Sequence, residues 1–257
     1  MKTVLIRGIF LIVLTLVIAL QLCAQGVYWE SVTTAMGMEQ QSRTHYMPKM
    51  FKSVNSGMGG ERTVIFRMDR GVMYEVNAAE KTYSETSFDE LEKTMKSMGG
   101  QMGEKMAEVK KQMESLPPEQ RKMMEQMMGA MPGAAAQGEM HVTRTDESQK
   151  ISGFNCTKFV VKRGENEVAT IWATKELKEL EGMRRDFEEF SRRITMNRAA
   201  QGMVEAMRKV EGFPIQNETQ GMKQLVTKLE KRTIPASEFE IPAGYTKVKS
   251  ELLEQKY

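Results

Sequence analysis

Polar and apolar residues alternate along much of the chain between residues 27 and 85, which is the pattern of strands with one buried face. Five extended runs are predicted there, at residues 27–36, 46–54, 64–68, 72–76 and 81–84. Pro48 lies inside the second run and marks it as an edge strand or a bulge. The last two runs are separated by a turn at 77–80 and form a predicted hairpin.

At Ser87 the period of the pattern changes from about two to about 3.6 residues. Ser87 and Glu90 have the spacing of a capping box, in which a hydroxyl and a carboxylate accept hydrogen bonds from free N–H groups at the start of a helix. A methionine-bearing helix follows, with an expected interruption at 99–100. A further short helix is expected at 119–128, and a flexible linker at 131–138.

The second half of the chain repeats this order of elements. Strands are predicted at 140–143, 154–162, 167–173, 213–219 and 223–233. The second and third of these form a hairpin, and a helical stretch at 175–210, broken at Gly182 and Gly202, precedes the fourth. The succession of strands, helices, strands, helices and strands predicts an α+β fold, with helices packed on one side of an antiparallel sheet.

The first 24 residues have the three parts of a secretory signal. Lys2 and Arg7 form a short positive region, residues 9–20 are an unbroken apolar run, and Ala24 is a small residue at the end of a short exit. As a helix, the apolar run would span about 18 Å, well short of a hydrocarbon core of about 30 Å. We therefore expect cleavage after Ala24 and a single domain at 25–257 without a transmembrane segment.

Two alternatives for the signal stay open. An uncleaved membrane anchor would need Gly8 and the flanking residues to lengthen the apolar span. A lipoprotein acylated on Cys23 would need a small residue just before the cysteine, and the bulky Leu22 argues against it.

Charge and cysteine content change the picture once the signal is removed. The formal net charge of +3 includes Lys2 and Arg7, and it falls to +1 without them. A nearly neutral chain gives no electrostatic reason to expect nucleic acid or an anionic membrane surface as a partner. Of the two cysteines only Cys156 remains, so an intramolecular disulfide is excluded and stability must come from a hydrophobic core.

No catalytic constellation is visible in the sequence. The two histidines, His45 and His141, are too few for a histidine-rich metal site, and the chain has no H-E-x-x-H, C-x-x-C or G-x-S-x-G motif. Cys156 lies near Phe154 and Phe159 within a predicted strand, which favours a buried inert thiol over a nucleophile. We therefore expect a protein that is not an enzyme and needs no cofactor.

Methionine is unusually frequent, with 24 residues in the chain and a concentration between residues 95 and 140. These side chains could fill a core, form an apolar surface that adapts to varied ligands, or bind Cu(I) through soft thioethers. The candidate copper ligands lie one helical turn apart in two pairs, Met123 with Met127 and Met124 with Met128. Segment 100–138 is therefore predicted to be a methionine-rich helical insert, and its glycine-rich ends suit a mobile cover.

Three stretches together carry a resemblance to a known family. They are residues 73–98, ISGFNCTKF at 151–159 with the strand that follows, and GFPI at 212–215 with the IPAGY tail at 241–245. The chain resembles a family of exported bacterial proteins known as a domain of unknown function (DUF4412). That family is itself similar to the periplasmic lipoprotein-carrier (LolA-like) superfamily. The resemblance implies a curved antiparallel sheet, or half-barrel, that wraps helices or is covered by them and can hold an acyl chain.

On this basis we expect a non-catalytic envelope protein, periplasmic or extracellular, that binds an acyl chain or a lipid-modified partner. The alternatives are a Cu(I)-handling protein, and a structural or interaction module of the envelope with no small ligand. The expected cavity walls are apolar residues of the sheet and of the first helix, although the same residues would equally form a closed core. They are Trp29, Phe66, Met68, Tyr74, Phe88, Leu91, Met95, Phe159 and Trp172.

We predict that the mature protein begins at Gln25 and carries no lipid on Cys23. The intact mass of protein recovered from the cell envelope would measure both properties at once. A diacylated species that begins at Cys23 would contradict both the processing and the absence of an anchor.

Overall fold

The computed structural model of the 257-residue chain describes residues 23–57, 60–114, 117, 119–120, 139–178, 180–194, 198–219 and 221–254. Its strands are β1 (Cys23–Ala35), β2 (Met38–Met47), β3 (Met50–Gly57), β4 (Gly60–Arg67), β5 (Val72–Asn77), β6 (Thr82–Ser87), β7 (Met140–Ile151), β8 (Phe154–Arg163), β9 (Asn166–Thr174), β10 (Phe213–Thr219), β11 (Met222–Pro235) and β12 (Thr246–Lys247). Its helices are α2 (Phe88–Glu114), α4 (Leu180–Ile194), α5 (Arg198–Arg208), α6 (Glu251–Glu254) and the 3-10 helix η1 (Ala236–Phe239).

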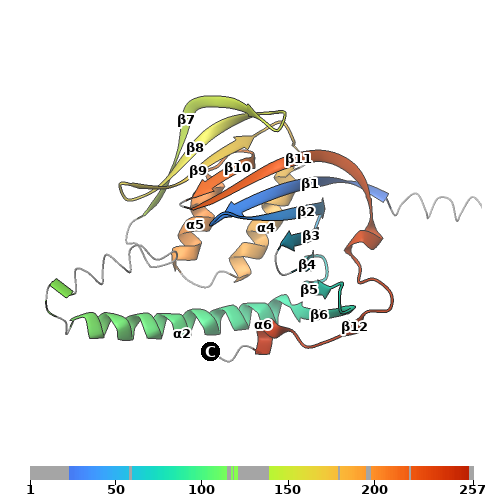
Figure 1. The fold of residues 1–257 in the computed structure, drawn as a ribbon, viewed down its shortest axis with the longest axis horizontal. Helices are drawn as coiled ribbons and strands as arrows, with labels where there is room; N and C mark the ends of the chain where they lie inside the picture. The colour runs from blue at the N-terminus through green and yellow to red at the C-terminus, as the bar shows by residue number, and fades with distance from the viewer. Residues whose placement is uncertain are drawn as a thin grey trace, which may run out of the picture.

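The strands of the described residues form one twelve-stranded sheet, built from two meanders. β1 to β6 pair in chain order, and so do β7 to β11, in the overall order β12-β6-β5-β4-β3-β2-β1-β11-β10-β9-β8-β7. The two meanders are joined by the antiparallel pairing of β1 with β11, from Cys23 opposite Pro235 to Ala35 opposite Met222. Figure 1 shows that the sheet is open and curves over α4 and α5.

A bulge and a glycine shape the central strand pair. The register of β1 against β11 shifts between Glu30 and Ser31, and the Thr227 hydroxyl donates to the Glu30 carbonyl over 3.3 Å. Such a bulge increases the local twist and bends the sheet. At Gly26, a Cβ would lie 2.4 Å from the Tyr46 carbonyl oxygen. Any side chain there would push β1 away from β2.

Helix α2 begins as the capping box predicts. The Ser87 N–H donates to the Glu90 carboxylate over 2.9 Å, and the Glu90 N–H donates to the Ser87 hydroxyl over 3.2 Å. The expected interruption at 99–100 is wrong, because α2 continues through both glycines. Each glycine costs about 1 kcal/mol relative to alanine, and the lysine, methionine and glutamine residues around them have high helix propensity and carry the helix across.

The expected helical stretch at 175–210 is two helices, α4 and α5, and the expected breaks are wrong. Gly182 lies in the first turn of α4, and Gly202 lies inside α5. At Gly182, a Cβ would lie 3.4 Å from the Tyr46 hydroxyl oxygen. This glycine therefore allows α4 to approach the sheet closely instead of ending the helix.

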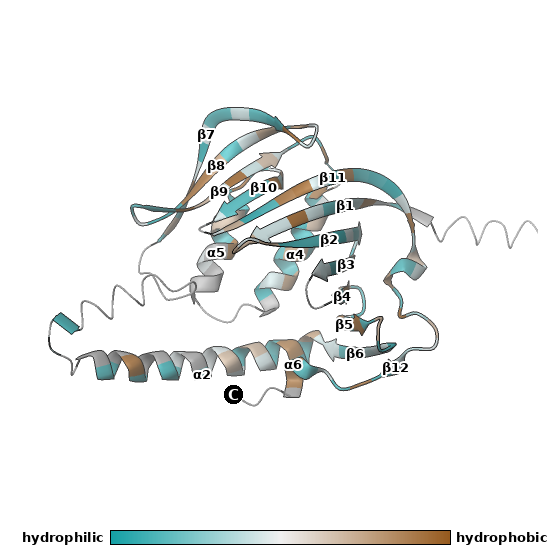
Figure 2. Ribbon diagram, in the orientation of Figure 1, coloured by the Kyte–Doolittle hydropathy of each residue, from teal (hydrophilic) through white to brown (hydrophobic). Residues whose placement is uncertain are grey.

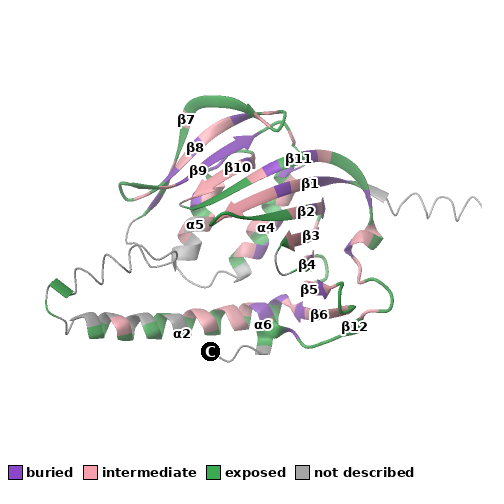
Figure 3. Ribbon diagram, viewed as in Figure 1, coloured by how far each residue is buried: buried purple, intermediate pink, exposed green. Residues whose placement is uncertain are grey.

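Three strand boundaries differ from the hydrophobic pattern. The run predicted at 46–54 is wrong, because Pro48 and Lys49 form the turn between β2 and β3, with Lys49 at φ 63°. β2 begins at Met38, in a polar stretch that the pattern did not assign, and β7 extends to Ile151 instead of ending at residue 143. Figure 3 shows β7 largely exposed at the edge and β9 largely buried. These polar segments are strands because they pair with a neighbouring strand, and not because they have an apolar face.

Different elements cover the two faces of the first meander. Phe66 points to the face on which α4 lies, and its ring centroid is 5.1 Å from that of Phe190. The adjacent Ile65 points to the opposite face and packs in a cluster with Phe239 of η1. β8 and β11 carry both brown and teal segments in Figure 2, as this alternation requires. The large, open and curved antiparallel sheet with a few helices confirms the α+β prediction at this level.

We predict that Cys156 is unreactive in the native protein. Its side chain is 1% exposed in β8, which confirms the expected burial, and burial raises the pKa of the thiol, so little thiolate forms at neutral pH. Labelling by iodoacetamide, followed by mass spectrometry, should be slow until urea unfolds the protein, and Cys156→Ala should leave ligand binding unchanged. Rapid labelling without urea would contradict this and reopen a role for the thiol.

Candidate functional site

The structure divides the nine expected wall residues among four buried clusters. Where α2 meets β4 and α4, five of them lie together: Phe66, Met68, Phe88, Leu91 and Met95. Trp29 and Trp172 belong to a second cluster, which includes Leu180 of α4. Phe159 belongs to a third, with Ala206 of α5. These eight side chains are parts of the hydrophobic core.

The ninth residue, Tyr74, lies on the other face of the sheet. It pairs with Ile65 across β4 and β5 and packs against Tyr83, with ring centroids 6.3 Å apart. Its cluster contains Phe239 from the C-terminal segment. Because successive residues of a strand point to opposite faces, Tyr74 cannot share a cavity with Phe66, and the expectation of one common wall is wrong for this residue.

An apolar groove lies elsewhere, between α4, α5 and the start of β10. Its volume is about 310 Å³, within the range of small-molecule sites. The apolar part of its wall comes from all three elements: Leu180, Met183, Phe187, Val204, Met207 and Phe213. None of the nine expected residues lines it. This groove is the candidate functional site.

A second, polar chamber of about 270 Å³ adjoins the groove. The two share Arg184 of α4 and Arg208 of α5 in their walls. Arg184 Nη1 donates to Glu188 Oε1 over 2.7 Å, whereas Arg208 Nε lies 3.7 Å from Glu188 Oε2, too far for a hydrogen bond. Lys175 and Glu211 also line the chamber and pair with each other. The site as a whole is therefore an apolar groove beside a charged chamber, with lining residues shared by both.

The position of α4 is fixed by the buried carboxylate of Asp186. It accepts the Tyr46 hydroxyl over 2.9 Å and the Lys49 backbone N–H over 2.8 Å, and it pairs with the Lys49 ammonium at 3.1 Å. Burial and the hydrogen bond to Asp186 raise the pKa of Tyr46 far above its ordinary value, so the phenol stays a donor. These contacts tie α4 to the β2–β3 turn and so place one wall of the groove.

Sequence reasoning missed the groove, although one signal pointed toward it. Met183 and Phe187 lie four residues apart on α4, and Val204 and Met207 lie three apart on α5, which predicts apolar stripes on two short helices. Such stripes predict packing against the sheet. They do not show which part of the stripe the sheet leaves uncovered.

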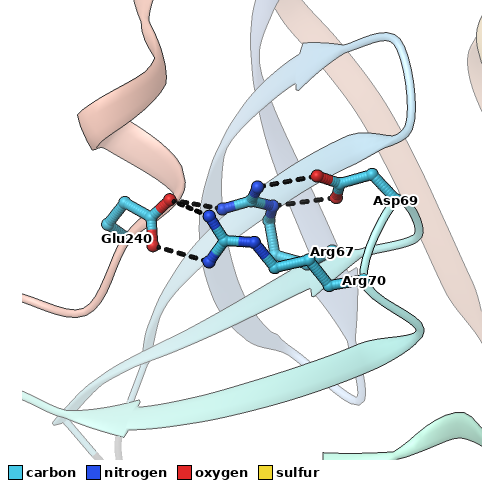
Figure 4. Close-up of polar contacts among 4 residues, drawn as sticks. All are labelled: Arg67, Asp69, Arg70 and Glu240. Carbon is cyan, nitrogen blue, oxygen red and sulfur yellow. Dashed lines mark hydrogen bonds and ion pairs between the residues drawn. The ribbon is translucent and has the colours of Figure 1, made fainter.

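The C-terminal segment is fastened to the β4–β5 turn by an ion-pair network, drawn in Figure 4. Arg67, whose side chain is 6% exposed, donates to Asp69 over 2.9 and 2.7 Å and to Glu240 over 2.5 Å. Arg70 donates to both oxygens of Glu240, over 2.8 and 3.0 Å. Burial by itself would raise the pKa of Glu240, but the hydrogen bonds from Arg70 and Arg67 outweigh it and hold the pKa below its ordinary value.

Other chemistry is limited within the described ranges. No helix there is long and apolar enough to cross a membrane, and no three His, Cys, Asp or Glu side chains gather as metal ligands. The four methionines of the copper hypothesis lie outside the described residues: Met123, Met124, Met127 and Met128. That hypothesis stays a prediction.

These observations define the class of the protein: it has an open, curved antiparallel sheet, and its helices bound an apolar groove. The family model named Domain of unknown function (DUF4412) matches residues 89–245, more than half of the chain. The protein belongs to this family, which confirms the resemblance seen in the sequence. No curated protein matches the chain.

Solved structures with similarity to the chain share little of its sequence. An uncharacterised conserved protein from Thermus thermophilus is 6% identical, with 87% of this chain and 90% of that chain covered and a TM-score of 0.42. The MucA/MucB complex of Pseudomonas aeruginosa gives 7% identity, 87% and 58% coverage, and a TM-score of 0.39. PNGF-II gives 10% identity, 90% and 33% coverage, and a TM-score of 0.38. TM-scores below 0.5 establish neither a common fold nor a common function.

We predict that Glu240→Gln destabilises the protein, most strongly near neutral pH. Loss of the carboxylate leaves buried Arg67 with fewer acceptors, which costs about 1–2 kcal/mol after allowance for the partial exposure of Glu240. Because the pKa of Glu240 is lowered in the folded state, its contribution is complete above roughly pH 5 and is lost as the pH falls through the folded-state pKa.

Urea unfolding of both proteins from pH 7 down to pH 3 would measure this. The difference in the free energy of unfolding should shrink on acidification. A difference that stays constant with pH would contradict the assignment. Glu165→Gln, in the exposed β8–β9 turn, is the matched control and should change stability little at any pH.

Proposed function

We propose that the protein is a non-catalytic component of the cell envelope that binds an apolar ligand, an acyl chain or a lipid-modified partner, in the groove between α4, α5 and β10. The observation that carries the proposal is the apolar character of the groove wall. Met183 and Phe187 face it from α4, Met207 from α5, and Phe213 from β10. An apolar concave surface bounded by three elements is the usual form of a small-molecule site.

Burial of hydrocarbon supplies the binding energy in this mechanism. Each methylene that moves from water into an apolar wall contributes about 0.8 kcal/mol. The volume of about 310 Å³ suits a single chain better than several. Two wall residues, Met183 and Met207, have flexible thioether side chains that can repack around chains of different shape. No covalent chemistry on the ligand is needed.

The curved sheet supports the finer part of the proposal, a half-barrel like that of the lipoprotein carriers. In that arrangement the sheet gives a rigid support, and the short helices α4 and α5 form the adaptable side of the site. Export by the signal at 1–24 would place the protein in the periplasm or outside the cell. The methionine-rich segment at about 100–138 is proposed as a cover over the apolar site. In the described residues this segment begins inside the continuous helix α2.

We predict that the double variant Met183→Gln/Met207→Gln binds decanol about tenfold more weakly than the wild type. Glutamine has nearly the size of methionine, but its amide would lose hydrogen bonds to water when the alkyl chain covers it. Isothermal titration calorimetry with decanol would measure the affinity. Native mass spectrometry of protein taken from the envelope would show whether a lipid is already bound.

The matched control is Met36→Gln/Met38→Gln. These two methionines are 89% and 53% exposed at the β1–β2 turn and lie outside the groove, so their substitution should leave decanol binding unchanged. Wild-type protein that binds no decanol and carries no lipid would contradict the proposed function. Equal binding by both double variants would place the ligand elsewhere.

A further inference from the structure

The chamber beside the groove contains an arginine that lacks a good partner. Arg208 Nε is buried and has no hydrogen-bond acceptor among the described residues, although a third of the whole side chain is exposed. In the part of the chain that the structure describes, the carboxylate oxygen that faces it is Glu188 Oε2 at 3.7 Å, beyond hydrogen-bond range. A buried donor without an acceptor is costly, so such a group calls for an explanation.

The other charged groups of the chamber do not meet this need. Among the described residues, three acids and three bases line the groove and chamber: Lys175, Arg184, Arg208, Glu181, Glu188 and Glu211. Lys175 pairs with Glu211, and the Glu188 carboxylate already accepts from Arg184 at 2.7 Å. Glu181 is exposed at the start of α4. The formal charges balance, yet the geometry leaves Arg208 with the weakest pairing.

From this we infer that the ligand is an anionic amphiphile, whose alkyl tail lies in the apolar groove and whose carboxylate or phosphate head binds Arg208 in the adjoining chamber. The inference rests on the proposed function and deepens it. A guanidinium presents several N–H donors in a planar fork that matches carboxylate and phosphate oxygens. Arg208 lines both spaces, so one molecule can occupy them together. The head supplies the acceptor that Glu188 does not.

Glu188 has a defined role in this arrangement. Its carboxylate lies between Arg184 and Arg208 and therefore competes with the head group for both guanidinium groups. Its removal frees Arg184 and removes a negative charge next to the incoming anion. A substitution at Glu188 should thus tighten the binding of an anionic amphiphile, whereas a merely structural ion pair would give no such gain.

The test compares decanoate with decanol, which has the same tail and a neutral head, by isothermal titration calorimetry on the exported protein. We expect the wild type to bind decanoate about tenfold or more tightly than decanol. Arg208→Gln should remove this preference while decanol still binds, which also shows that the groove is intact. Glu188→Gln should raise decanoate affinity about fivefold or more and leave decanol unchanged.

The neighbouring residue on α4 provides the control. Glu189 is exposed and pairs with Lys49 away from the chamber, so Glu189→Gln removes the same charge from the same helix and should change neither affinity. If Arg208→Gln loses decanol binding too, the Glu188→Gln variant tests the inference instead. A higher affinity for decanoate, with unchanged affinity for decanol, supports the inference, and an unchanged affinity for decanoate overturns it.

The remaining outcomes separate the two proposals. If decanol binds as tightly as decanoate in every variant, the head-group inference is overturned and the apolar groove stands. Where neither compound binds, both proposals fail. A further titration with inorganic phosphate tests whether the chamber binds a free anion and not the head group of an amphiphile. Phosphate that binds as tightly as decanoate would overturn the amphiphile, whereas weak or absent binding supports it.

Discussion

The pairing of β1 with β11 is the constraint on which the rest of the structure depends. It joins residues from 187 to 212 positions apart, from Ala35 opposite Met222 to Cys23 opposite Pro235. Closure of so long a loop costs conformational entropy before any contact compensates it. Without this ladder, two meanders would each expose the edge of a long strand. With it, the six strands before α2 and the six after it form one sheet. The bulge at Glu30-Ser31 bends that seam, and Gly26 allows β2 to lie close to β1 on its other side.

The continuous sheet decides where the apolar side chains are buried and where they stay accessible. Large side chains of the sheet, Trp29 of β1 and Phe159 of β8 among them, are enclosed when the sheet curves over α4 and α5. The first meander is also covered on its other face by the C-terminal segment, around Phe239. An apolar groove remains where α4 and α5 meet the start of β10.

Two arginines show how differently this protein treats a buried guanidinium. Arg67 is almost fully buried, and Asp69 and Glu240 satisfy its donors over 2.5–2.9 Å. The ion-pair network of Arg67 holds the C-terminal segment in place, and each charged group in this network has a partner of opposite charge. Arg208 is more exposed, yet its Nε has no acceptor in the described part of the chain. The first arrangement is complete in itself, and in our proposal a ligand oxygen completes the second.

What the sequence by itself determined is local. The Ser87–Glu90 capping box, the hairpins at β5–β6 and β8–β9, the α+β order and the family resemblance all rest on spacing within a few residues or on stretches of matching sequence. Polar strand segments were missed because their pairing partners, and not their own patterns, keep them extended. The glycines of α2 and α4 were misread because flanking turns and close packing outweigh their low helix propensity.

Only the tertiary structure decided which apolar residues form a site. An alternating pattern shows that Tyr74 has a buried face, but the face is chosen by its register with Ile65. A stripe on a helix shows that Met207 packs, but the gap beside it depends on how α5, α4 and β10 meet. The orphaned Arg208 Nε likewise follows from a distance to Glu188 on another helix. Hydrophobic burial acts on every apolar side chain alike, so the sequence specifies that these residues leave water, and only the three-dimensional packing specifies which of them keep room for a ligand.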